Sequence, residues 1–213
     1  EICNGACADI YIINTCTVTA DADRKSRNII RHCVRLKNKG KVIVTGCLAE
    51  KDVRTIAEIQ GVDLIISKRF FRDGISGFGE RTRAFIKVQD GCNNRCSYCK
   101  IPLARGASRS RSTGDIVSEA RKVVACGYKE IFLTGICLGA YQNEKKDKNS
   151  LVRLLTELEK ISGLLRIRLS SIEAADVNDD LIGKMADSEK LCPHLHIPIQ
   201  SGDDHILKMM NRS

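Results

Sequence analysis

Short runs rich in isoleucine and valine alternate with longer amphipathic stretches along the first third of this chain. The apolar runs are ADIYIINT, KVIVTG and VDLIIS, and the amphipathic stretches between them extend from about Asp21 to Lys37 and from Asp52 to Gln60. Strands of a parallel sheet that is covered on both faces read as continuous β-branched runs separated by helices. The sequence therefore predicts an α/β fold whose first domain is a parallel sheet covered on both faces.

The same alternation starts again after an irregular, charged and glycine-rich segment, FFRDGISGFGERTR. Because this segment has the period of neither a helix nor a strand, we place a domain boundary near Gly79 and predict domains at residues 1–78 and 79–213. Four further strands are predicted beyond it, AFIKVQ, EIFLTG, LRIRLSS and HLHIPIQ, with helical patterns between them. Repeated strand–helix units of this spacing predict part of a (β/α) barrel, whose chemistry lies in the loops after the strands.

The composition restricts the classes of protein to which this chain can belong. Its 213 residues include 11 cysteines, an odd number at too low a density for a small disulfide scaffold, which favours metal or redox chemistry in a reducing compartment. No apolar run approaches the roughly 20 residues of a membrane-spanning helix. The net charge of +9 permits a polyanionic partner, whereas the scarcity of aromatic residues argues against single-strand binding by base stacking.

Three cysteines follow the first strand of the predicted second domain in the sequence DGCNNRCSYC. Cys92, Cys96 and Cys99 have the spacing C-x3-C-x2-C, so three thiolates from one short loop can bind three corners of an iron–sulfur cubane. The fourth iron would then lack a protein ligand and could bind a substrate or cofactor. Structural zinc is the alternative, but it usually requires four ligands, and no fourth Cys or His lies close in the sequence.

This loop and its surroundings resemble a known family. A C-x3-C-x2-C loop with an aromatic residue before its last cysteine, here Tyr98, is similar to that of the radical S-adenosylmethionine (SAM) superfamily, which implies that Tyr98 lies beside the cofactor. The longer stretch FIKVQDGCNNRCSYCKIPLARGASRSR resembles the methylthiotransferase family, as do ADIYIINTCTV, VIVTGCLAE, TGICLGAY and HLHIPIQSGDDHILKMMNR. The resemblance covers nearly the whole chain, and RLSSIEA and LKMMNR look most like the branch that acts on threonylcarbamoyladenosine in tRNA.

The resemblance implies a cytoplasmic transferase in which a [4Fe-4S] cluster on the three loop cysteines binds SAM and cleaves it to a 5′-deoxyadenosyl radical. The radical would remove hydrogen from C2 of an adenine, to which a methylthio group is then added. The implied partners are a tRNA substrate and an electron donor such as a flavodoxin or ferredoxin, with no membrane. The alternatives are the isopentenyl-adenosine branch, the ribosomal-protein branch and a non-catalytic metal-binding remnant. Against the family pattern the last barrel strands and the C-terminal RNA-binding domain are missing, so we expect a partial barrel.

Two cysteines of the first domain, Cys16 and Cys47, each directly follow a predicted parallel strand. Neighbouring strands lie about 4.8 Å apart and open α/β folds bind ligands at the strand ends, so both thiols could serve one cluster. The resemblance implies that they are the second and third ligands of an auxiliary [4Fe-4S] cluster, whose first ligand would lie upstream of this chain. Cys3 and Cys7 could replace that ligand, but they precede the strand and would lie at its wrong end.

Several polar residues are predicted to contact the cofactor. Arg109, which lies close to Arg105 and Arg111, could pair with a cofactor carboxylate or an RNA phosphate, unless this basic loop is simply solvated. The resemblance implies that Glu130 meets the methionyl amino group, although an exposed Glu at the start of a strand would look the same. Residues at the ends of the predicted third and fourth strands could contact ribose or adenine: Ser171, Glu173, Gln200 and Ser201.

The remaining cysteines and one histidine pair are predicted to be structural. Four cysteines lie in helical or strand patterns, where a buried and inert thiol is the common case: Cys33, Cys126, Cys137 and Cys192. His194 and His196 alternate along a predicted strand and could suggest a metal pair. We favour packing and hydrogen bonding for them, since the family resemblance gives them no metal role.

Overall fold

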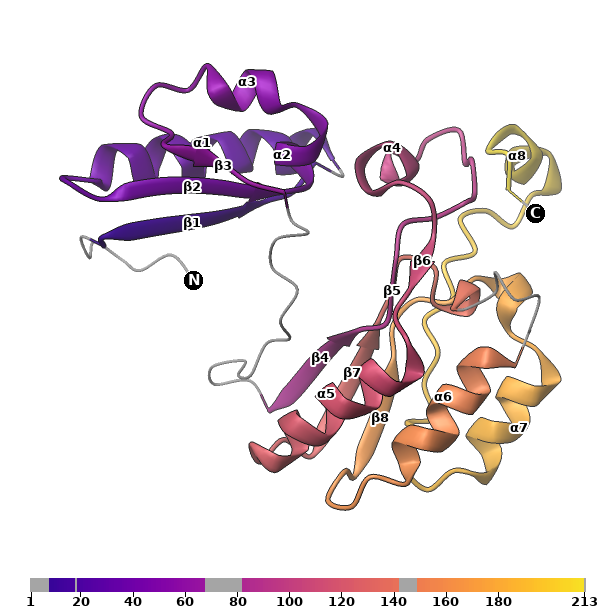
Figure 1. Ribbon diagram of the computed structural model, residues 1–213. Helices are drawn as coiled ribbons and strands as arrows, with labels where there is room; N and C mark the ends of the chain where they lie inside the picture. The colour runs from indigo at the N-terminus through magenta and orange to yellow at the C-terminus, as the bar shows by residue number, and fades with distance from the viewer. Residues whose placement is uncertain (1–7, 18, 68–81, 142–148, 213) are drawn as a thin grey trace. The chain divides into compact units, whose positions relative to one another are not determined.

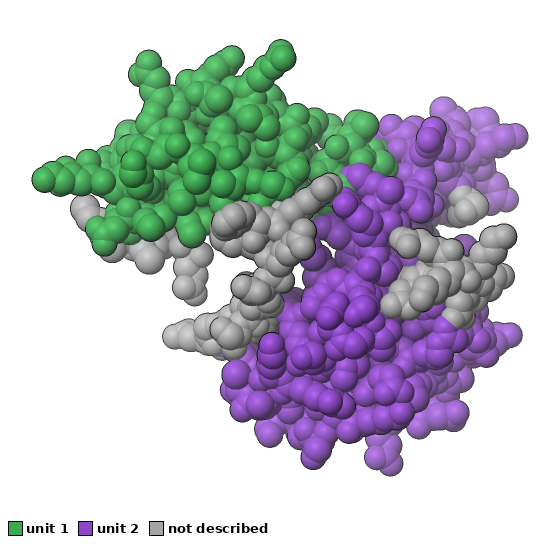
Figure 2. Space-filling view, in the orientation of Figure 1, with its two compact units in different colours: residues 1–73, 99–105 green, residues 74–98, 106–213 purple. Residues whose placement is uncertain are grey.

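The computed structural model describes residues 8–17, 19–67, 82–141 and 149–212 (Figure 1). The chain divides into two compact units, which Figure 2 colours separately: a first unit of residues 1–73 with 99–105, and a second unit of residues 74–98 with 106–213. The predicted boundary near Gly79 lies outside the described residues. Within the described ranges, no helix combines the length and apolar character that crossing a membrane requires.

The first unit contains a three-stranded parallel sheet with the strand order β1-β2-β3. Its elements are β1 (Ile10–Thr15), α1 (Ala20–Leu36), β2 (Lys41–Gly46), α2 (Cys47–Lys51), α3 (Val53–Ala57) and β3 (Leu64–Ile65). The register pairs Thr15 with Gly46, so β1 and β2 end side by side. The parallel α/β sheet predicted from the apolar runs is therefore confirmed.

The helices α1, α2 and α3 of the first unit share a single core with one face of this sheet. That core consists of Ile13, Ile30, Cys33, Val42, Val44, Leu48, Ala49 and Ile56. All three helices contribute to it, and α1 buries its stripe at the helical spacing expected for an amphipathic helix. On β1, Ile10 and Ile12 are each 56% exposed, because they point to the other face. Among the described residues this differs from the predicted sheet covered on both faces.

The second unit contains a second parallel sheet with the order β4-β7-β8, and a short antiparallel pair of β5 with β6. Its elements are β4 (Arg83–Lys87), β5 (Gln89–Asp90), β6 (Arg109–Ser110), α5 (Thr113–Ala125), β7 (Glu130–Thr134), η2 (Leu138–Ala140), α6 (Ser150–Glu159), β8 (Arg166–Leu169), η4 (Ala174–Asp176), α7 (Asp179–Asp187) and α8 (Asp204–Met209). The helix α4 (Ile101–Arg105) groups with the first unit. Parallel strands alternating with α5, α6 and α7 are the repeating arrangement of a partial (β/α) barrel (Figure 1).

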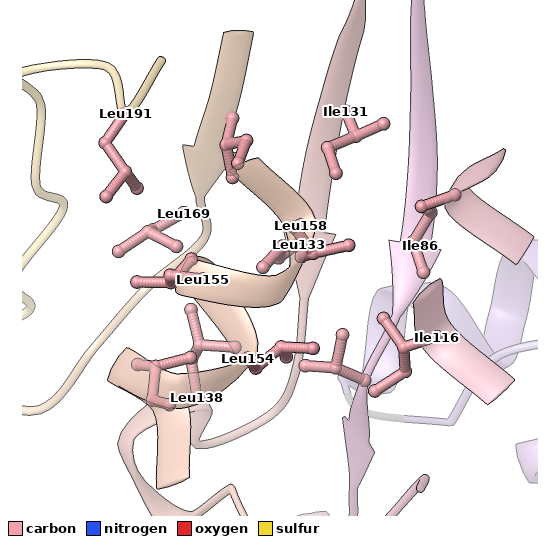
Figure 3. Close-up of a cluster of buried hydrophobic side chains, with 14 of the residues drawn as sticks. Ile86, Ile116, Ile131, Leu133, Leu138, Leu154, Leu155, Leu158, Leu169 and Leu191 are labelled. Carbon is pink, nitrogen blue, oxygen red and sulfur yellow. The ribbon is translucent and has the colours of Figure 1, made fainter. Parts of the chain in front are cut away.

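Leucines of α6 and alternate residues of the strands form the core of the second unit. Figure 3 shows these side chains meeting between the helix and the sheet. The core includes Ile86, Ile131, Leu133, Ile167 and Leu169 from the strands and Leu151, Leu154, Leu155 and Leu158 from α6. Burying one such side chain stabilises the fold by about 1.5 to 3 kcal/mol. This packing fixes the strands whose C-terminal loops carry the site described below.

The predicted fourth strand, HLHIPIQ, is not a strand in the described structure. The chain runs beside β8, with one isolated bridge between Ile167 and Leu191 and a hydrogen bond of 3.1 Å from the N–H of Ile172 to the carbonyl of His196. Pro193 and Pro198 have no N–H to donate to a ladder, and proline is confined to the edges and ends of sheets. The prediction of a regular strand here was therefore wrong.

Candidate metal centre

The three-cysteine loop begins directly after β5, the strand that pairs with β6. Gly91 has a φ of 75°, and a Cβ at this position would lie 2.2 Å from the carbonyl oxygen of Ala107. Only glycine fits such a turn without strain. The N–H of Cys92 then donates to the carbonyl of Gly106 over 3.2 Å. Cys92 and Cys96 line a cavity of about 420 Å³ within the second unit.

Backbone N–H groups donate to two of the cysteine sulfurs. The N–H of Asn94 donates to Sγ of Cys92, and the N–H of Ile101 donates to Sγ of Cys99, each over 3.4 Å. Such hydrogen bonds orient a sulfur as a metal ligand. The three loop cysteines are all partly exposed and none forms a disulfide. Three thiols are the ligand set that a [4Fe-4S] cluster with one open iron requires. Cys92 and Cys96 belong to the second unit and Cys99 to the first, and among the described residues their sulfurs are not gathered around one ion position.

A buried side chain, Gln89, joins the cysteine loop to the loop after β7. Its Oε1 accepts hydrogen bonds from the N–H groups of Ile136 over 2.9 Å and Cys137 over 3.0 Å. Its Nε2 donates to the carbonyl of Gly91 over 2.7 Å and to Oγ of Ser108 over 2.8 Å. Both ends of the amide are therefore satisfied inside the protein, and the network holds the two loops in one arrangement.

Cys137 and Asp176 form part of the cavity wall. The thiol of Cys137 donates to Oδ2 of Asp176 over 3.6 Å. Burial, together with the nearby Asp176 and Cys92, raises the pKa of Cys137 to about 12, so the thiol keeps its proton. Burial also raises the pKa of Asp176, although the bond from Cys137 partly opposes this. Cys137 is buried as predicted, but it lines the cavity and does not belong to the hydrophobic core.

Two of the predicted cofactor residues, Glu173 and Tyr98, meet at a third side chain, Arg212. Glu173 lines the cavity and forms an ion pair with Arg212, whose Nη1 also donates to Oη of Tyr98 over 3.1 Å. Burial lowers the pKa of Arg212, but the charge of Glu173 and the contact with Tyr98 raise it overall. Arg212 is therefore a permanent cation in the cavity wall.

Three other predicted cofactor residues do not line this cavity: Arg109, Ser171 and Gln200. Arg109 is exposed on β6, where it pairs in register with Asp90. Oγ of Ser171 lies 2.7 Å from Nδ1 of His196, which gives that histidine a hydrogen-bonding role. Gln200 is exposed, with its Nε2 donating weakly to Pro198 over 3.5 Å.

The basic loop around Arg109 is partly engaged elsewhere. Arg111 donates to the carboxylate of Glu119 over 2.5 Å and to the carbonyl of Lys87 over 2.9 Å. Arg105 belongs to α4 and groups with the first unit. The structure therefore does not bring these three arginines together at the cavity.

Glu130 lies at the N-terminal end of β7, whereas the cysteine loop and the loop after β7 lie at the C-terminal side of the strands. Its carboxylate accepts from Arg166 over 3.0 Å and from Arg168 over 3.2 Å, with Arg83 at 3.7 Å. These partners are the strand neighbours of β7, so Glu130 neutralises charge across the sheet. The structure thus corrects the expectation that Glu130 reaches the methionyl amino group.

We expect Glu130→Gln to destabilise the second unit by about 1 to 2 kcal/mol, because a nearly buried carboxylate with charged partners is lost. Burial raises the pKa of Glu130, but the bonds from Arg168 and Arg166 and the charge of Arg83 bring it below the ordinary value of 4.5. The ion cluster therefore stabilises the fold above pH 4.5, and this contribution disappears as the pH falls through the lowered folded-state pKa.

Urea unfolding of the intact protein between pH 3 and pH 7 measures this effect. The wild type should lose more stability on acidification than Glu130→Gln. Glu157→Gln is the matched control, because its ion pair with Lys160 is exposed on both sides and should contribute almost nothing. Equal pH dependence in the wild type and Glu130→Gln would contradict the assignment.

Cys16 and Cys47 follow the paired ends of β1 and β2 in the first unit. Cys16 is exposed, and Cys47 is buried as the first residue of α2. The strand ends thus place the two residues as neighbours at one edge of the sheet, whereas Cys3 and Cys7 lie outside the described residues. Within the described ranges, no group of three or more Cys, His, Asp or Glu side chains surrounds a single ion position.

Sequence reasoning missed several residues of the cavity and its supports: Gln89, Asp176, Asn211 and Arg212. Gln89 directly precedes the aspartate and glycine that lead into the cysteine loop, and a polar residue ending a buried apolar run is a usable signal. Asn211 and Arg212 are more than 100 residues from the loop, so no local pattern could join them to it.

The loop with three thiols follows β5 and opens on a polar cavity beside a parallel (β/α) sheet, an arrangement typical of iron–sulfur proteins. Residues 86–213 match the sequence model of the radical SAM superfamily, and residues 2–67 match the uncharacterized protein family UPF0004. The chain belongs to the radical SAM superfamily.

Curated relatives match nearly the whole of this chain. The chain is 42% identical to the threonylcarbamoyladenosine tRNA methylthiotransferase MtaB of Bacillus subtilis, over 96% of this chain and 52% of that protein. It is 35% identical to the tRNA-2-methylthio-N(6)-dimethylallyladenosine synthase of Carboxydothermus hydrogenoformans, over 96% of this chain and 54% of that protein. The chain thus spans about half the length of these relatives.

Among solved structures, the chain is similar to the radical S-adenosylmethionine methyltransferase TsrM of Kitasatospora setae, with a TM-score of 0.61. The match covers 95% of this chain and 52% of that one, with 16% sequence identity. At this identity the similarity is one of fold alone.

Proposed function

We propose that this chain forms the cluster-binding core of a tRNA methylthiotransferase that acts on C2 of N6-threonylcarbamoyladenosine. The observation that carries the proposal is the three-cysteine loop, from which Cys92 and Cys96 line a polar cavity at the ends of parallel strands. The 42% identity to MtaB of Bacillus subtilis supports this choice of modified adenosine.

Cys92, Cys96 and Cys99 would hold a [4Fe-4S] cluster and leave one iron for SAM. The bound cluster and SAM supply the radical chemistry, which ordinary side chains cannot provide at an unactivated C–H bond. The protein itself would bind the cluster and SAM and orient them. Asp176, Glu173 and Arg212 all line the cavity, so it offers charges of both signs, which suits a ligand that carries both an ammonium and a carboxylate group.

The other partners belong to the same proposal. Cys16 and Cys47 would be two ligands of a second, auxiliary cluster, because adjacent strands place them at one edge of the first unit's sheet. A flavodoxin or ferredoxin would donate the electron, and the substrate would be a tRNA in the cytoplasm. The net charge of +9 is compatible with an RNA partner.

Mass spectrometry of tRNA nucleosides from cells with and without the intact gene tests the proposal. Loss of the gene should remove 2-methylthio-N6-threonylcarbamoyladenosine and leave its unmethylthiolated precursor. The 35% identity to a dimethylallyladenosine synthase favours a second candidate, for which the 2-methylthio-dimethylallyl nucleoside would disappear instead. An unchanged nucleoside profile would contradict both candidates.

A further inference from the structure

The segment that ends α8 is hydrogen-bonded to the three-cysteine loop at several points. The N–H of Ser97 donates to the carbonyl of Met210 over 3.0 Å, and its Oγ donates to the carbonyl of Met209 over 3.3 Å. Nδ2 of Asn211 donates to the carbonyl of Arg95 over 2.8 Å. These bonds join residues separated by 112 or more positions and bracket Cys96 on both sides.

The end of α8 is itself rigidly shaped. Asn211 has a φ of 52°, and its N–H donates to Lys208 over 3.0 Å, while the N–H of Arg212 donates to Leu207 over 3.0 Å. This pair of bonds is the Schellman motif, in which a glycine or asparagine in the left-handed region ends a helix. The motif fixes the direction in which the side chains of Asn211 and Arg212 leave the helix.

Arg212 then connects three segments through a single guanidinium. It donates to Oη of Tyr98 in the cysteine loop, to the carboxylate of Glu173 after β8, and to the carbonyl of Pro198 over 3.0 Å. Its side chain is only 11% exposed. A planar fork can serve three acceptors at fixed angles, which the ammonium of a lysine cannot reproduce.

We propose that residues 209–212 act as a clamp that orders residues 95–98 of the cysteine loop before any cluster binds, with Arg212 as the positioning residue. A short loop with three thiols gains little order from its own sequence, because it has no core to bury and ordering each residue costs conformational entropy. The clamp supplies that order from the protein scaffold, as preorganised metal sites require. The ordering of the loop is independent of the proposed function, whereas its effect on iron loading rests on it.

Hydrogen–deuterium exchange on the metal-free intact protein, kept anaerobic with a chelator, tests the clamp directly. Arg212→Gln should speed the exchange of residues 95–98 by about tenfold, since a charge-assisted hydrogen bond contributes at least that factor to a local opening equilibrium. Asn211→Gly keeps the left-handed turn but removes the bond to Arg95, and it should give a smaller increase. Arg212→Lys should behave like Arg212→Gln, because it keeps the charge but loses the fork.

Lys184→Gln is the matched control, because it removes a comparably buried ion pair, with Glu159, from the same unit. It should lower global stability without changing exchange at residues 95–98. Iron uptake from a limiting supply, measured per chain, should be slower by about tenfold in Arg212→Gln and unchanged in Lys184→Gln.

Exchange in Arg212→Gln that equals the wild type, or that rises equally in Lys184→Gln, would overturn the clamp. The two proposals fail separately. A wild type that cannot cleave SAM, with a loop that loosens in Arg212→Gln, contradicts the enzyme but supports the clamp. A wild type that cleaves SAM, with a loop whose exchange is unchanged in Arg212→Gln, supports the enzyme but contradicts the clamp.

Discussion

Replacing any one of Cys92, Cys96 and Cys99 with alanine should reduce the iron of the anaerobically reconstituted protein by about four atoms per chain and abolish its reductive cleavage of SAM. A cubane held by two thiolates is exposed at two irons, so it is easily lost and no longer presents one defined open corner. We expect SAM cleavage to fall by more than about 100-fold, since the radical chemistry comes from the cofactors and not from side chains. The readouts are iron per chain, the paramagnetic resonance signal of the reduced cluster, and 5′-deoxyadenosine by chromatography.

Cys126→Ala is the matched control for this series, because Cys126, contrary to its predicted burial, is an exposed thiol at the end of α5 that does not line the cavity. It should retain the iron and the cleavage of the wild type. A variant that lacks Cys96 and still binds the full complement of iron would show that the loop is not the cluster site. Tight binding of one zinc ion with no cleavage in the wild type would instead favour a metal-binding module.

Gly91→Ala should destabilise the second unit by about 3 kcal/mol or more and also impair iron binding. The new Cβ would lie 2.2 Å from the carbonyl oxygen of Ala107 and 2.6 Å from that of Gly106, both of which are backbone atoms that cannot rotate away. The φ of 75° adds the cost of a left-handed conformation, about 1 kcal/mol or more for a residue with a side chain. Relieving the contact of the new Cβ would move the backbone at Cys92. The substitution should therefore lower stability and also displace a cysteine that is proposed to bind iron.

Gly183→Ala is the control for the same chemical change in the same unit. Gly183 lies inside α7, a Cβ there meets nothing within 4 Å, and its φ is not positive. Alanine favours a helix interior over glycine by up to about 1 kcal/mol, so this variant should be as stable as the wild type or more stable. Urea unfolding compares the two variants, and equal stability would show that the turn at Gly91 tolerates a side chain.

The sequence predicted those parts of the site that lie within one loop or directly after one strand. Cys92 and Cys96 reach the cavity because they follow β5 within a few residues, and Glu173 reaches it because it follows β8. Glu130 was misplaced because its environment depends on the strands beside it. In the linear sequence it is a glutamate at the start of an apolar run, and only the register with Arg83 and Arg166 shows that its carboxylate is occupied.

The last predicted strand shows a second limit. Its alternation of apolar and polar residues is typical of a strand, but a ladder also needs N–H donors on the correct side, and Pro198 within the segment removes one of them. Whether a proline is compatible with a strand depends on which strand lies beside its missing N–H. The residue pattern alone therefore could not decide whether this segment forms a strand.

By itself, the sequence determined the α/β alternation, the two parallel sheets and the loop that carries three thiols, because hydrophobic period and ligand spacing are local properties of the chain. Tertiary structure alone decided what surrounds those thiols. Asp176 and Arg212 come from distant segments, and Gln89 bonds to the distant loop after β7, so the roles of all three follow from hydrogen bonds that form only when the strands and α8 are packed. Such bonds depend on three-dimensional proximity and direction, which no pattern along a single chain encodes.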